Sequence, residues 1–283
     1  GAESDGDCEF VRDLAASLGL PFHTRTLNPA ASRNERNLQA WARAERYKFL
    51  ESTACRRKYS QIAVAHHLDA RAETMAAAVL DAGGTFALSG IPPVRGMIIR
   101  PLFDVSRTEI TSFLSSREMS YRVDSSNESD KYQRNRIRHT VLPLWKGENL
   151  GIVEGLARLG EQLWLQRRYL EDQAQRIVER SMVSTTVSGV TLRVEPLMRA
   201  DRALDPYVLR ELVARIGLDL VPRATTVMRF SELRNWTELR GTFSIEQGKF
   251  AALLSQGVIR VYKKRSRTAA PNQEIAGLPT PAL

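Results

Sequence analysis

Apolar residues in the first part of the chain recur with helical spacing in some stretches and run continuously in others. Phe10, Leu14 and Leu18 are spaced as on one face of a helix, and Gly19 ends this pattern. Residues 60–65 form a short apolar run that is typical of a buried parallel strand. The pattern therefore predicts, in order, a helix over 4–18, a strand over 20–27, a helix over 34–55, a strand over 60–65 and a helix over 69–81.

This alternation of helices and strands, with short connections, predicts an α/β fold built on a doubly wound parallel sheet. A sheet covered by helices on both faces needs more strands than the two that this part of the chain supplies. Either another segment completes the sheet, or the fold lacks its first β-α-β unit within these residues.

The pattern changes after residue 82. Met97 to Leu102 reads as extended, Ser106 is a helix cap, and a very basic helix over 132–142 is expected to end at Pro143. The spacing then predicts a helix over 152–181, a hairpin over 185–194, helices over 205–216 and 224–235, and strands over 241–245 and 258–262. We interpret residues 1–145 as one α/β domain, 146–262 as a smaller helical or α+β domain, and 263–283 as a tail or linker.

Composition narrows the class of partner. The 283 residues include 41 Lys and Arg against 32 Asp and Glu, a formal net charge of +9 that suits a polyanionic partner. Cys8 and Cys55 form no Cys-x-x-Cys pair, which favours a reducing, cytoplasmic compartment and argues against a zinc or iron–sulfur site. No apolar run approaches the roughly 18–20 residues that span a bilayer, so we expect no membrane partner.

Four residues whose side chains could take part in catalysis or ligand binding follow the predicted strand over 60–65, namely His66, His67, Asp69 and Glu73. Open α/β sheets bind ligands where their strands end. Asp69 and Glu73 are four residues apart on one helical face, so their carboxylates could hold an ammonium group or a hydrated Mg²⁺. The structural alternative is that Asp69 caps the helix and Glu73 is solvated near its N-terminus.

Arginines form the second group of candidates. Arg134 and Arg138 are one helical turn apart on the same side, whereas Arg136 points away. Guanidinium groups this close repel one another unless anions neutralise them, and their fork suits phosphate, so we favour anion binding over a solvated basic helix. Arg43 and Arg46 fit a nucleic-acid surface and a charged helix face equally well.

These stretches resemble the tRNA(Ile)-lysidine synthetase family of PP-loop ATP pyrophosphatases. The matching motifs occur in the family's order; they are Ala65-His66-His67-Leu68-Asp69-Ala70-Arg71-Ala72-Glu73-Thr74, Ser89-Gly90-Ile91-Pro92-Pro93-Val94-Arg95, Ile99-Arg100-Pro101-Leu102, Asp104-Val105-Ser106-Arg107, Asp124-Ser125-Ser126-Asn127 and Arg134-Asn135-Arg136-Ile137-Arg138-His139. Trp41-Ala42-Arg43 to Arg46-Tyr47 also looks like the family's Ala-Arg-x-x-Arg-Tyr helix. The resemblance covers about residues 1–145, and it implies the family's adenine-nucleotide α-hydrolase-like fold.

The resemblance implies a tRNA-modifying ligase. Such enzymes use ATP to adenylate C2 of the wobble cytidine in an isoleucine tRNA with a CAU anticodon, and the ε-amine of free L-lysine then displaces AMP to give lysidine. The residues carried over as catalytic are His66, His67, Asp69 and Glu73, with Glu73 binding the lysine. Those carried over as binding ATP phosphate are His67, Arg134 and Arg138, and those as binding tRNA are Arg43, Arg46, Asn127, Arg136 and Arg138. ATP and Mg²⁺ are the implied cofactors, and a homodimer is a further expectation.

The family's Ser-Gly-Gly-x-Asp-Ser loop, which holds the ATP phosphates, does not occur in the 283 residues. We expect this loop ahead of Gly1, and we expect the chain alone to lack ATP–pyrophosphate exchange. Another PP-loop enzyme, such as a tRNA thiolase or an amidating synthetase, ranks last because the chain has no paired cysteines.

Four positions depart from the family where ligands are expected: Ala70, Arg71, Ala78 and Asp81. A methyl group at Ala70 and a cation at Arg71 are expected to weaken a site for a lysine ammonium group. These departures motivate the alternative function, a tRNA-binding relative without catalysis.

Overall fold

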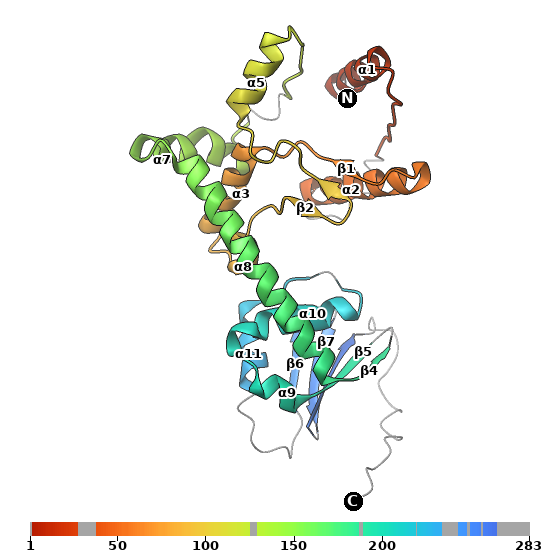
Figure 1. The fold of residues 1–283 in the computed structure, drawn as a ribbon, viewed down its shortest axis with the longest axis vertical. Helices are drawn as coiled ribbons and strands as arrows, with labels where there is room; N and C mark the ends of the chain where they lie inside the picture. Colours follow the sequence, from red (N-terminus) through yellow and green to blue (C-terminus); the bar gives the residue numbers. More distant parts are fainter. Residues whose placement is uncertain are drawn as a thin grey trace, which may run out of the picture. The chain divides into compact units, whose positions relative to one another are not determined.

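The computed structural model describes residues 2–27, 38–124, 129–186, 189–218, 220–233, 243–247, 250–255 and 257–264 (Figure 1). The chain divides into two compact units, Gly1–Trp164 and Leu165–Leu283. This division falls within one long helix, whereas the domain boundary expected from the sequence lies near residue 145. Most of the expected tail, 265–283, lies outside the described residues.

The first unit is mostly helical. Its helices are α1 (Ala2–Ser17), α2 (Leu38–Arg57), α3 (Leu68–Leu80), α4 (Thr85–Leu88), α5 (Arg107–Ser116), α6 (Gln133–Arg136), α7 (Leu142–Glu148) and the start of α8 (Ile152–Ser181). The helices expected at α1, α2, α3, α5 and α8 are confirmed. Ser106 caps α5 as expected, because its hydroxyl accepts a hydrogen bond from the Glu109 amide and the Glu109 carboxylate accepts one from the Ser106 amide.

The sheet of the first unit is small. Its strands are β1 (Ile62–Ala63), β2 (Val94–Arg95) and β3 (Ile98–Ile99), in the order β1-β3-β2. The expected parallel pairing is present between β1 and β3, whereas β2 and β3 form an antiparallel hairpin. Gly96, between β2 and β3, has φ +57°, a backbone conformation that glycine adopts without strain.

The strand expected over 20–27 is wrong. These residues are described and carry no strand assignment. A loose polar–apolar alternation is not sufficient, because a strand also needs a neighbour with which to form its ladder of hydrogen bonds. The backbone amide of Leu20 instead donates to the carbonyl of Ala15, at the end of α1.

Helix α3 is fixed by its apolar face. Ala72, Met75 and Ala76 are at most 1% exposed and pack in one cluster with residues of α7 and α8. A second cluster packs α2 against the sheet through Ala54, Ile62 and Ile98. Burial of these side chains supplies the main favourable free energy for holding α2 and α3 in place. The two helices carry four of the candidate functional residues, namely Arg43, Arg46, Asp69 and Glu73.

The basic helix does not end at Pro143, so that expectation is wrong. A π-helical turn, Ile137–Val141, joins α6 to α7, and the Leu142 amide donates to the carbonyl of Ile137. A proline within a regular helix has no amide hydrogen to donate, and its ring clashes with the carbonyl four residues earlier. The wider turn removes this conflict, so the helix continues to Glu148.

Arg71 links α3 to α8. Its guanidinium group is 6% exposed, lies 3.8 Å from the centre of the Phe103 ring and donates to the Asp104 carboxylate. It also donates to the Ala157 carbonyl at 2.9 Å and lies 3.5 Å from a Glu161 oxygen. This buried arginine therefore holds together three segments of the first unit.

The second unit contains a five-stranded antiparallel sheet in the order β4-β5-β8-β7-β6. The strands are β4 (Met182–Thr186), β5 (Gly189–Arg193), β6 (Phe243–Gln247), β7 (Phe250–Ser255) and β8 (Val258–Lys263). The helices are the rest of α8, α9 (Val194–Arg199), a 3₁₀ turn (Arg202–Leu204), α10 (Asp205–Arg215) and α11 (Ala224–Leu233). The expected hairpin at β4 and β5 is confirmed, whereas strand β7 was missed. Across the described residues, no helix has both the length and the apolar character needed to traverse a bilayer.

We predict that Arg71→Met lowers the free energy of unfolding by about 1–3 kcal/mol, because buried carbonyl groups lose a charged donor. The measurement is urea unfolding followed by tryptophan fluorescence. Arg117→Met is the matched control, since Arg117 is exposed and also lies over an aromatic ring, that of Phe113. An equal effect of both substitutions would contradict a linking role for Arg71.

Candidate functional site

Strand β1 is followed closely by His66 and His67, and α3 then begins. The N-cap residue is His67, not Asp69, so the alternative that Asp69 caps this helix is wrong. The Asp69 carboxylate instead accepts a hydrogen bond of 2.7 Å from the backbone amide of Arg107, the first residue of α5. The His67 ring, whose Nδ1 lies 3.5 Å from the Asp69 carboxylate, and this amide lower the pKa of Asp69 to about 2. Asp69 therefore carries a negative charge at neutral pH.

Glu73 lies at the centre of the site. Its side chain is 2% exposed, and its two oxygens each accept a hydrogen bond of 2.6 Å, one from Nε of Arg134 and one from Nε of Arg138. Arg138 also donates from Nη2 at 3.2 Å. The sequence predicts that Glu73 binds the lysine and that Arg134 and Arg138 bind phosphate, and the structure brings these three side chains together.

The charges in this cluster do not cancel. One carboxylate faces two guanidinium groups, which leaves one positive charge beside the exposed parts of Arg134 and Arg138, 47% and 21% of their side chains. Charge-assisted hydrogen bonds fix the Nε edges of both groups on Glu73, and Arg134 keeps part of its fork toward solvent. The arrangement can bind an anion without first ordering these long side chains.

The remaining predicted residues are more dispersed. Nη1 of Arg136 donates to the carbonyls of Asp130 and Lys131, so Arg136 points away from Glu73 as expected. Arg46 is exposed on α2. Asn127 lies outside the described residues.

His66 and Arg43 lie side by side at another part of this edge. Nε2 of His66 is 3.5 Å from Nη2 of Arg43, and Nδ1 of His66 is buried with no hydrogen-bond partner among the described residues. Burial is the main reason that the pKa of His66 is lowered to about 4, and the positive charges of Arg100 and Arg43 add to the effect. His66 is therefore a neutral imidazole at pH 7.

Sequence reasoning missed Arg107 and Lys146 as site residues. Both line a cavity of about 140 Å³ together with Asp69, Glu73 and Arg138. Arg107 belongs to the motif Asp104-Val105-Ser106-Arg107, so its place in the motif was the available signal. Lys146 could not be found, because the helix was expected to end before it.

Two of the four departures from the family pattern have a structural explanation. Arg71 lies two residues before Glu73 on α3, and its guanidinium group contacts Phe103 and α8, so its charge is directed away from Glu73. Asp81 accepts a hydrogen bond of 2.7 Å from Gln133, at the start of α6. Ala70 and Ala78 are buried, at 2% and 7% exposed.

The donor set does not by itself make a magnesium site. In the part of the chain that the structure describes, no group of three or more His, Cys, Asp or Glu side chains could hold a metal ion. Both Glu73 oxygens already bind guanidinium groups, so Asp69 is the nearby carboxylate that remains accessible. Mg²⁺ prefers oxygen ligands and commonly takes them from substrate phosphates, so its involvement stays a prediction.

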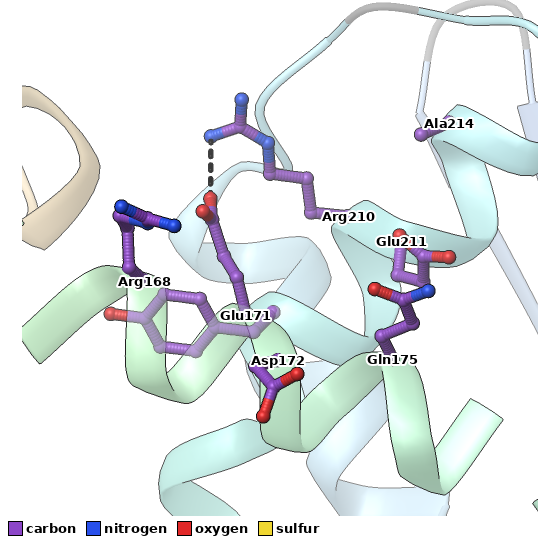
Figure 2. A pocket seen from close by; sticks show the side chains of 8 residues that line it. Arg168, Glu171, Asp172, Gln175, Arg210, Glu211 and Ala214 are labelled. Atoms are coloured by element: carbon purple, nitrogen blue, oxygen red, sulfur yellow. Dashed lines mark ion pairs between the residues drawn. The ribbon is translucent and has the colours of Figure 1, made fainter. Parts of the chain in front are cut away.

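A larger cavity, of about 400 Å³, lies in the second unit between α8 and α10 (Figure 2). Glu171 pairs there with Arg210 at 3.8 Å and with Arg167 at 2.8 Å, and Glu211 pairs with Arg215 at 2.7 Å. Most of the charged side chains that line this cavity form ion pairs within the chain. None of the functional residues predicted from the sequence lines it.

Comparison with known proteins gives a consistent result. Residues 1–145 match the family described as PP-loop domain. The tRNA(Ile)-lysidine synthase of Solibacter usitatus is 36% identical over 220 residues, which are 76% of this chain and 47% of the relative. That of Geobacter sulfurreducens is 32% identical over 224 residues, 78% of this chain and 48% of the relative. The chain thus spans about half the length of these curated relatives. Among solved structures, the U34-tRNA thiolase NcsA from Methanococcus maripaludis matches 56% of each chain at 15% identity, with a TM-score of 0.47.

We predict that stability falls as the pH decreases from about 6.5 to about 4, and that His66→Gln reduces this slope. The pKa of His66 is about 4 in the folded protein and near 6.5 when unperturbed, so only the unfolded state binds the proton in this window. Urea unfolding at several pH values between these limits measures the effect. His139→Gln, at a histidine that is 40% exposed, is the control. An unchanged slope in His66→Gln would contradict the buried neutral imidazole.

We predict that Glu73→Gln lowers the free energy of unfolding by about 1–3 kcal/mol. This is less than the roughly 3–5 kcal/mol for breaking a fully buried ion pair, because both arginines can reach solvent. The control is Asp7→Asn, which removes the exposed partner of Arg122 in the same unit, and should stay within about 0.5 kcal/mol. Chemical denaturation measures both, and a Glu73→Gln protein as stable as the control would show that the cluster does not hold the helices.

Proposed function

This chain belongs to the PP-loop domain family, and from that premise we propose that it takes part in ATP-dependent synthesis of lysidine on tRNA. The proposed substrates are free L-lysine and an isoleucine tRNA with a CAU anticodon. The C2 oxygen of the wobble cytidine is adenylated by ATP with release of pyrophosphate. The ε-amine of lysine then forms the C–N bond at C2, AMP leaves with that oxygen, and the amine loses a proton.

The observation that carries the proposal is the Glu73–Arg134–Arg138 cluster next to the end of β1. It combines residues from two motifs that are far apart in the sequence at the edge where open α/β sheets bind ligands. A site of this kind favours a reaction in which negative charge develops on phosphate oxygens, because the positive groups are already fixed before the substrate arrives.

Roles for the individual residues follow from their chemistry. Arg134 and Arg138 would bind a phosphate group through their solvent-exposed sides, and His67 would donate a hydrogen bond to the same ligand. Asp69 is ionised and is more exposed than Glu73, so it is the more accessible carboxylate for the lysine ammonium group. Glu73 could share in that contact only by exchanging a guanidinium partner. The tRNA would lie along Arg43, Arg46, Asn127, Arg136 and Arg138.

The ATP phosphates need a further element. Because the sequence contains no Ser-Gly-Gly-x-Asp-Ser motif, we propose that residues outside it supply this loop and the strands beside it. Arginine side chains can clamp phosphate oxygens, but backbone amides of a glycine-rich loop approach them more closely. On this proposal the described residues bind the tRNA, the lysine and a phosphate group.

A second candidate function is tRNA binding without catalysis. It is favoured by Ala70, a buried methyl group at a position where the family usually has a carboxylate. A relative that keeps the arginines but lacks one acid would retain affinity for phosphate and lose the alignment of lysine that the reaction needs.

The test compares residues 1–283 with the same residues joined to an N-terminal segment that carries the Ser-Gly-Gly-x-Asp-Ser motif of the tRNA(Ile)-lysidine synthetase family. Each is incubated with ATP, L-lysine and a tRNA(Ile) transcript with a CAU anticodon, and lysidine is measured by mass spectrometry of the digested tRNA. We expect lysidine from the joined protein and none from residues 1–283 alone.

Circular dichroism and tRNA binding establish that both proteins are folded. A joined protein that is folded and binds tRNA but forms no lysidine would favour the non-catalytic function. Lysidine from residues 1–283 alone would contradict the need for an outside loop.

A further inference from the structure

Tyr47 of α2 lies between two guanidinium groups. The Cζ atom of Arg43 is 5.2 Å from the centre of the Tyr47 ring, and that of Arg95, in β2, is 4.9 Å from it. Arg43 also donates to the Tyr47 hydroxyl at 3.4 Å. Each contact is a cation–π interaction, so one tyrosine positions two arginines that are far apart in the sequence.

A third arginine, Arg100, interacts electrostatically with this pair. Arg100 is 7% exposed and donates from Nη1 to the Pro92 carbonyl at 2.5 Å. Its Nε is buried and has no hydrogen-bond partner among the described residues. Burial is the main reason that the pKa of Arg100 is lowered, and the charges of Arg95 and Arg43 add to the effect. A buried guanidinium donor that lacks an acceptor is costly.

We call Arg43, Tyr47, His66, Arg95 and Arg100 the tyrosine cluster. Within the described residues, no carboxylate forms an ion pair with any of its three arginines. The cluster differs in this from Arg134 and Arg138, which share Glu73. Arg43 and Arg95 lie over one ring, and their charges also act on Arg100, so the three guanidinium groups repel one another. Burial is the main cause of the lowered pKa of His66, and the charges of Arg100 and Arg43 add to it.

A purely structural role explains this arrangement poorly. Buried arginines that serve packing alone have acceptors around them, as Arg71 does with two carbonyls and two carboxylates. The tyrosine cluster instead leaves Nε of Arg100 and Nδ1 of His66 buried without a hydrogen-bond partner among the described residues, and Arg43 and Arg95 are exposed. A dianionic or polyanionic group at this position would neutralise the arginines and accept hydrogen bonds from them.

We propose that the tyrosine cluster is a binding site for a phosphate group, with Arg95 and Arg43 as its exposed clamp and Arg100 as its buried floor. The phosphate belongs either to a free polyphosphate or to the backbone of an RNA, since both present the same tetrahedral oxyanion. The site is separate from the Glu73 cluster in its residues. For the RNA ligand this inference deepens the proposed function, which lays the tRNA along Arg43, and rests on it. The binding experiment needs neither ATP nor lysine, so its failure is distinguishable from a failure to form lysidine.

The experiment measures affinity of residues 1–283 for two probes, inorganic pyrophosphate and an unmodified tRNA(Ile) transcript, without ATP or lysine. The variants are Arg95→Gln and Arg43→Gln, both at exposed positions. Arg117→Gln is the matched control, since it removes the same charge from an exposed arginine over an aromatic ring outside the cluster. Thermal unfolding of all three establishes that the fold is retained.

We expect Arg95→Gln and Arg43→Gln to weaken binding of at least one probe about tenfold or more, the effect of losing one charge-assisted hydrogen bond. Arg117→Gln should change it less than about twofold. Loss confined to pyrophosphate identifies a polyphosphate as the ligand, and loss confined to tRNA, with a shallower salt dependence, identifies the RNA backbone. Equal effects of all three variants on both probes, or no effect, overturn the proposal.

An independent readout is the NMR signal of the His66 ring in the unsubstituted protein. A phosphate bound beside His66 offsets the arginine charges, so it should raise the pKa of His66 from its low value. Saturating probe that leaves the His66 titration unchanged would place the phosphate elsewhere and overturn the proposal.

Discussion

The first unit depends on one buried carboxylate. Taking the Glu73 side chain out of water is unfavourable unless charged donors compensate for the lost hydration, and Arg134 and Arg138 supply them. The same hydrogen bonds join α3 to the helix that carries both arginines. Structure and chemistry are therefore coupled here, because the ion pairs that hold the helices in place also leave a net positive charge at the edge of the sheet.

Many elements could be predicted from the sequence because their signals are local. The capping pair of Ser106 and Glu109 and the helical spacing in α3 and α8 depend on neighbours along the chain. The strand expected over 20–27 failed because strand formation depends on a partner that periodicity does not reveal. Strand β7 was missed for a related reason, since the short apolar run Phe250–Ser255 has no alternation to distinguish it from a loop or a buried helical turn.

The candidate site was predicted in its residue types and less well in its contacts. Helical spacing predicted Arg134 and Arg138 on one side of a helix and Arg136 on the other, and the contacts of these arginines agree with it. The predicted membership of the PP-loop family is also confirmed. Spacing could not show that Glu73 is the anion for both arginines, because that contact joins segments 61 and 65 residues apart. Nor could it show that Arg71 points away from Glu73, since its partners lie on a loop and a later helix.

The π-helical turn Ile137–Val141 has a consequence for the geometry of the whole helix. Ile137 and Leu142 are five residues apart, so a regular helix would direct them about 140° apart around its axis, yet both belong to the core cluster that covers α3. The wider turn changes the angular phase between the segment that carries the arginines and the segment that follows. If one residue were deleted from this turn, the helix could not both bury Leu142 in the core and direct Arg134 toward Glu73. Length, as much as residue identity, is therefore under constraint in this segment.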